Sequence, residues 1–86
     1  MAGIEDVRAN LSAATTQASE ALYALKQAAL TINEVQRVLD DTVASSARES
    51  AQHAISAFHQ AFSQAEQAQE LVISGRDSID TYAAQL

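Results

Sequence analysis

Residues 35–49 read VQRVLDDTVASSARE, and two apolar heptad patterns meet out of phase within them. Upstream, apolar residues recur at alternating spacings of three and four from Ile4 to Leu39. Downstream, the same spacings run from Ala44 to Leu86. The five-residue step between the two patterns does not fit a single straight helix of about 3.6 residues per turn. Each pattern therefore predicts a separate coiled-coil helix.

Local signals in the same stretch indicate a turn. Asp40 and Asp41 carry negative charge where a helix C-terminus disfavours it. Ser46 followed three residues later by Glu49 has the spacing of a capping box, which starts a helix. We therefore predict an all-α fold, an antiparallel two-helix coiled-coil hairpin. Its first helix covers about residues 4–41, its turn about 41–45 and its second helix about 46–85.

An antiparallel pair also predicts which residues face each other, because the two residue numbers in each layer have a constant sum. A sum of 86 pairs large side chains with small ones, for example Leu25 with Ala61 and Leu11 with Gly75. Gly75 is then either a packing notch or the end of the second helix, and the unbroken heptad favours a continuous helix. The same layers would also form between two extended chains in a swapped dimer.

Composition supports helix throughout and limits the partners. The 86 residues include nineteen Ala, two Gly and no Pro, and the chain has no Cys for a disulfide, a thiolate metal site or a catalytic thiol. The net charge is −6, and the five basic residues are spread along the chain. A nucleic acid or an anionic membrane surface needs clustered basic residues, so we expect neither as a partner.

The N-terminal residues lack the basic and apolar segments of a signal peptide, and no apolar run approaches the roughly 20 residues of a membrane span. We expect synthesis as a cytoplasmic protein, with leaderless secretion as an open possibility.

No pattern indicates catalysis. His53 and His59 are six residues apart, which turns them by about 120° on a helix, so they cannot share a metal ion. The inward heptad positions are apolar, and neither a Gly-rich phosphate loop nor a G-x-S-x-G motif is present. We predict a non-enzymatic chain with no catalytic, cofactor or metal site.

A second apolar strip beside the predicted seam is the candidate interaction site. Its residues are Leu22, Tyr23, Leu30, Ile55 and Phe62. Such a strip widens the apolar surface beyond a coiled-coil seam, as helices of larger bundles require. We predict a protein–protein interaction module that forms a homodimeric four-helix bundle. Docking of another helical protein and a small-ligand-binding bundle are the alternatives.

Two segments carry a family resemblance: residues 4–9, Ile-Glu-Asp-Val-Arg-Ala, and the tail with Leu71, Gly75, Ile79, Tyr82 and Leu86. They resemble uncharacterised small Ala-rich actinobacterial proteins, whose segments also occur at the N-termini of predicted toxins. The chain more distantly resembles the W-x-G hairpins of type VII secretion, although it has Val-Ala-Ser-Ser at residues 43–46 and no Trp. The resemblance implies an accessory or substrate of a type VII-like secretion or toxin system.

Overall fold

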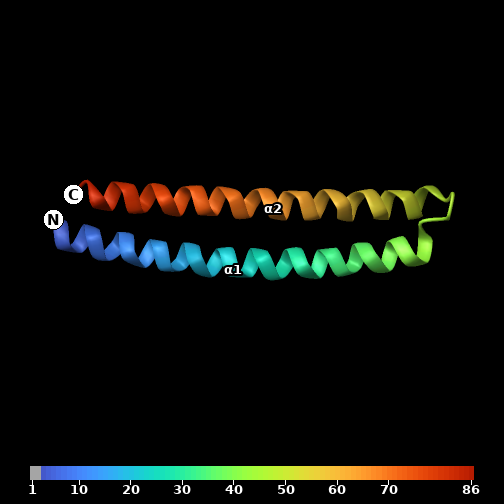
Figure 1. The fold of residues 1–86 in the computed structure, drawn as a ribbon, viewed down its shortest axis with the longest axis horizontal. Coiled ribbons are helices and arrows are strands. Elements are labelled where there is room, and N and C mark those ends of the chain that lie inside the picture. The colour runs from blue at the N-terminus through green and yellow to red at the C-terminus, as the bar shows by residue number, and fades with distance from the viewer. Residues whose placement is uncertain (1–2) are drawn as a thin grey trace.

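Two long antiparallel helices make up the protein. The computed structural model describes residues 3–86, in which α1 (Ile4–Val43) and α2 (Glu49–Ala84) are joined by residues 44–48. The helices lie side by side along their whole length, with both ends of the chain at one end and the turn at the other (Figure 1). The Cα atoms span 62 × 19 × 15 Å. The prediction of an all-α antiparallel hairpin is confirmed.

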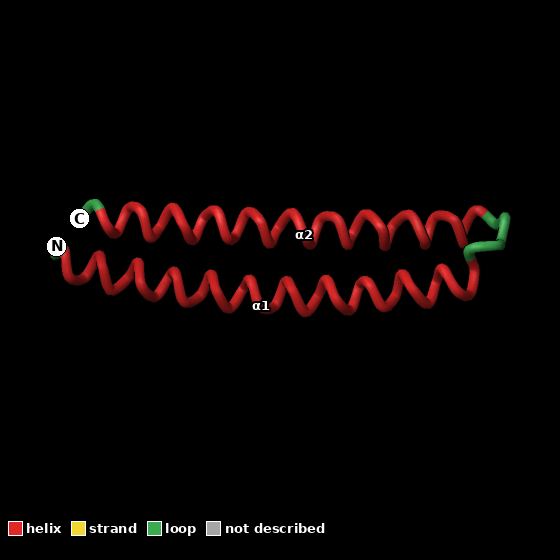
Figure 2. Tube along the Cα trace, in the orientation of Figure 1, coloured by secondary structure: helices red, strands yellow, loops and turns green. Residues whose placement is uncertain are grey.

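The turn lies slightly later in the chain than predicted. α1 continues to Val43, two residues past its predicted end, and α2 begins at Glu49 instead of residue 46 (Figure 2). Ser46 organises this turn: its backbone N–H donates to the Val43 carbonyl at 2.9 Å, and its Oγ accepts from the Arg48 N–H at 3.2 Å. The Ser46 carbonyl also accepts from Nε2 of Gln52 at 2.8 Å. Arg48 is then the N-cap residue, and Glu49 places its negative charge in the first turn, where the helix dipole favours it.

The register between the helices differs from the predicted one. Thr15 Oγ1 donates to Asp80 Oδ1 at 3.4 Å, and Nη1 of Arg76 donates to Ser19 Oγ at 3.3 Å. Both pairs of residue numbers add to 95, so the predicted sum of 86 is wrong. The later end of α1 at Val43 and the later start of α2 at Glu49 account for five of these nine residues of displacement along α1.

The seam is also rotated relative to the predicted one. One predicted column of α1, which includes Leu25 and repeats every seven residues, does face α2. The other predicted column, which includes Ala21, is replaced by the column one residue later, which includes Leu22. The corresponding rotation of α2 brings Ile55 and Phe62 to the seam, so larger apolar side chains are buried than the predicted alanines would provide. The seam residues of α1 are Leu11, Thr15, Ala18, Leu22, Leu25, Ala29, Ile32, Gln36, Leu39 and Val43.

Gly75 lies within α2, which continues to Ala84. A Cβ atom added at Gly75 would have no neighbouring atom within 4 Å, so this residue is not a packing notch against Leu11. Within residues 3–86, neither helix contains a segment with the length and apolar character of a membrane span.

Candidate interaction faces

The five residues of the predicted strip do not form one surface. Leu22 is only 7% exposed and belongs to the seam. Ile55 and Phe62 are half-buried seam residues of α2. Tyr23 and Leu30 are 67% and 59% exposed. Leu22 therefore offers no surface to a partner, and Tyr23 and Leu30 are the members of the strip that do.

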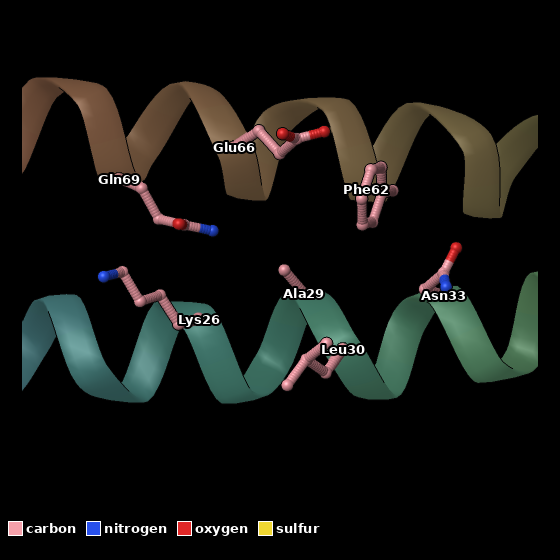
Figure 3. Close-up of a pocket in the computed structure, with 7 residues that line it drawn as sticks. All are labelled: Lys26, Ala29, Leu30, Asn33, Phe62, Glu66 and Gln69. Atoms are coloured by element: carbon pink, nitrogen blue, oxygen red, sulfur yellow. The ribbon is translucent and has the colours of Figure 1, made fainter.

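An apolar groove is lined by two residues of the predicted strip, one from each helix. Leu30 and Phe62 line a space of about 410 Å³ between the helices, with Ala29 beneath it. In Figure 3, the Phe62 ring points from α2 toward α1, and the side chains of Lys26 and Gln69 both extend into the space between the helices. The complete lining is Lys26, Ala29, Leu30, Asn33, Phe62, Glu66 and Gln69. The floor of the groove is apolar and its edge is polar.

The groove opens on the side of the hairpin that carries the polar contacts between the helices. Nε2 of His59 lies 3.9 Å from Oδ1 of Asp40, and both side chains are about half exposed. Such an exposed pair contributes little to stability. We call this the polar side; the columns next to the seam here are Ser19, Lys26, Asn33 and Asp40 on α1 and Gln52, His59, Glu66, Ile73 and Asp80 on α2.

Within residues 3–86, the two columns beside the seam on the opposite side of the hairpin carry no charged side chain. Two columns of each helix lie there, and all sixteen acidic and basic residues of the chain fall in other columns. We call this surface the charge-free face. The outer columns are residues 10, 17, 24, 31 and 38 of α1 and 50, 57, 64, 71 and 78 of α2. The inner columns are Val7, Ala14, Ala21, Ala28, Val35 and Thr42 on α1 and Ala54, Ala61, Ala68, Gly75 and Tyr82 on α2.

Large apolar side chains are exposed on the charge-free face. Leu71 is 72% exposed, Val38 60% and Tyr82 51%. Near the turn, Val35 and Val38 also line a mainly apolar groove of about 330 Å³, which Glu34 borders from the outer edge of α1. Isolated exposed apolar residues are common on proteins, but depletion of charged residues is typical of the core of a protein–protein interface.

This face is a signal that the sequence analysis did not use. Ala14, Ala21, Ala28 and Val35 were assigned to the seam because they continue a heptad with Leu11 and Leu25. They instead lie beside the seam, in a third apolar column of α1. Assigning every charged residue to its heptad column finds the charge-free columns from the sequence, but only the position of the seam shows which of them form one face.

Among residues 3–86, no three His, Asp or Glu side chains come together as ligands for a metal ion would. Comparison of the chain with protein-family models, with curated proteins and with solved structures gave no match.

Proposed function

We propose that this chain is a non-enzymatic protein–protein interaction module that self-associates into a dimeric four-helix bundle. The observation that carries the proposal is the charge-free face, which runs along both helices. The second copy would cover this face with its own.

The thin core of the single hairpin supports the proposal. Leu22 and Ala29 are its most buried apolar residues, and Gln36, which is polar, is buried to the same degree. Helices that belong to bundles bury about three of their seven heptad columns, whereas a simple coiled coil buries two. Here two columns of each helix form the seam, and the inner column of the charge-free face is the third.

The charges elsewhere on the chain oppose self-association, and the charge-free face is where two copies can meet without burying them. Each copy carries a net charge of −6, so two copies repel each other at long range. Contact through the charge-free face buries no ionised group, and burying an unpaired charge would cost several kcal/mol. The hairpin measures 62 Å by 19 Å. This corresponds to a footprint on the order of 1,000 Å², compared with about 800 Å² per partner in a standard interface.

Sedimentation equilibrium of the full chain and of Ala28→Glu tests the proposal. Ala28 is exposed near the middle of the charge-free face, and Glu is a good helix former, so the hairpin should tolerate the change. We expect the unmodified chain to have twice the 9.1 kDa monomer mass and the variant to be monomeric and still helical. The matched control is Ala9→Glu, the same substitution at an exposed position on the polar side, which should remain dimeric. A wild-type chain that stays monomeric at high micromolar concentration would refute self-association.

A further inference from the structure

A second copy can cover the charge-free face in two orientations. In one, the two turns lie together and α1 of each copy packs on α2 of the other. In the reverse one, the turn of each copy lies at the chain ends of the other, and α1 packs on α1. The face itself contains no charge that would distinguish the two orientations, so the residues at its outer edges decide.

The two outer edges of the hairpin differ in charge. Each edge is formed by the column that points away from the seam, and its residues are exposed. The edge of α1 carries the acidic residues Asp6, Glu20, Glu34 and Asp41. The edge of α2 carries no acidic residue; it consists of His53, Gln60, Gln67, Ser74 and Thr81.

This difference in charge favours one orientation. Packing α1 on α1 would bring two acidic edges together along one side of the dimer, and neighbouring like charges are destabilising. Packing α1 on α2 would place each acidic edge beside an edge of amides, hydroxyls and a histidine. Resting on the proposed self-association, we infer that the second copy docks with its turn beside the turn of the first, so that α1 of each copy lies on α2 of the other.

The register of the hairpin makes the pairing along the edges specific. Residues of α1 and α2 at the same height have numbers that add to about 95. With the turns together, Glu34 lies at the height of the partner's Gln60, and Glu20 at the height of the partner's Ser74. Asp41 similarly lies at the height of the partner's His53. These three acidic residues thus each lie beside a side chain that can donate a hydrogen bond, whereas Asp6 lies past the last residue of the partner's α2 edge.

Spin-label distances measure the orientation directly. The chain has no native Cys, so Ser45→Cys in the turn and Gln85→Cys at the other end can each be labelled at a single exposed site. Packed helices lie roughly 10 Å apart, so with the turns together we expect two Ser45→Cys labels within about 30 Å of each other. The same short distance is expected between two Gln85→Cys labels.

The reverse orientation predicts a different set of distances. Labels of the same kind would then be separated by about the 62 Å length of the hairpin. A mixture of the two labelled chains would instead give a short distance between unlike labels. That result would overturn the inferred orientation and leave self-association standing. A monomer mass with no dipolar coupling would refute self-association itself.

A charge exchange provides a second test. Gln60→Glu makes the α2 edge acidic opposite the partner's Glu34, and we expect it to weaken dimerisation roughly two- to fivefold, the scale of exposed like-charge pairs. Adding Glu34→Gln to the same chain again places one acid opposite one amide across the dimer, with their positions exchanged. The double variant should therefore dimerise like the unmodified chain. If the double variant is no tighter than Gln60→Glu alone, α1 does not lie on the partner's α2, and the inference fails.

Discussion

Leu22→Ala tests the seam at its most buried apolar position. Leu22 is 7% exposed, so nearly all of its side chain is removed from water. The substitution deletes three carbon atoms; at about 0.8 kcal/mol for each buried CH₂ group, the transfer term alone is about 2.4 kcal/mol. The cavity left between the helices raises the expected loss in free energy of unfolding to about 3 kcal/mol, in the range typical of buried Leu→Ala changes. For a domain of this length, such a loss should lower Tm by at least about 10 °C.

The adjacent residue provides the control. Tyr23 is larger than Leu22 but 67% exposed, so Tyr23→Ala should change the free energy of unfolding by no more than about 0.5 kcal/mol. Thermal and urea unfolding followed by far-UV circular dichroism measures both variants. Association is linked to stability, so the two are compared at matched concentrations over a dilution series. Equal losses for the two variants, or a negligible loss for Leu22→Ala, would show that the seam does not run through Leu22.

Two further substitutions distinguish seam from surface. The double variant Leu22→Glu with Phe62→Glu places two charges in the seam, so we expect circular dichroism to show loss of helicity and not only separation of a dimer. Leu30→Glu lies on the polar side and should leave both helicity and oligomeric state unchanged. Gly75→Ala should raise the free energy of unfolding by up to about 1 kcal/mol in dilute solution, because Ala is the better helix former and its Cβ meets no neighbour there. Gly3→Ala serves as its control: Gly3 is the N-cap of α1, where Ala is disfavoured, so this change should not stabilise the protein. A destabilised Gly75→Ala would mean that this position is packed.

The helices and the turn could be predicted from sequence because their signals are local. Alanine content and heptad spacing specify helix, and the phase break between Leu39 and Ala44 requires the chain to turn. The register could not be predicted in the same way. Each helix has two apolar columns and a third in which polar residues such as Gln36 and Gln69 interrupt the apolar ones, so the pattern favoured a seam through Ala21 over the one through Leu22. The choice depends on the rotation of both helices together and on the length of the turn around Ser46, which are properties of the packed pair.

The candidate interaction site was predictable only in part. Tyr23 and Leu30 lie off the seam, as the sequence analysis expected, whereas Leu22 was placed outside the seam because its neighbour Ala21 continued a more regular heptad. The sequence shows which heptad columns lack charged residues. Only the position of the seam shows that some of these columns lie side by side and form the charge-free face. With the seam through Leu22, the same alanines that had been assigned to the core become surface.

The hairpin connectivity makes contacts progressively more distant in sequence from the turn toward the chain ends. Asp40 and His59 are near neighbours along the chain, whereas Ser19 and Arg76 are 57 residues apart and Thr15 and Asp80 are 65 apart. Once the turn has formed, each further layer extends the structure without closing a new long loop, and loop closure is the entropic cost that slows distant contacts. We therefore expect the two helices to pair first near the turn and to separate first at the end of the hairpin opposite the turn. Among residues 3–86, the most buried side chains are Leu22, Ala29 and Gln36, and none of them lies at that end, so we expect its amide hydrogens to exchange first.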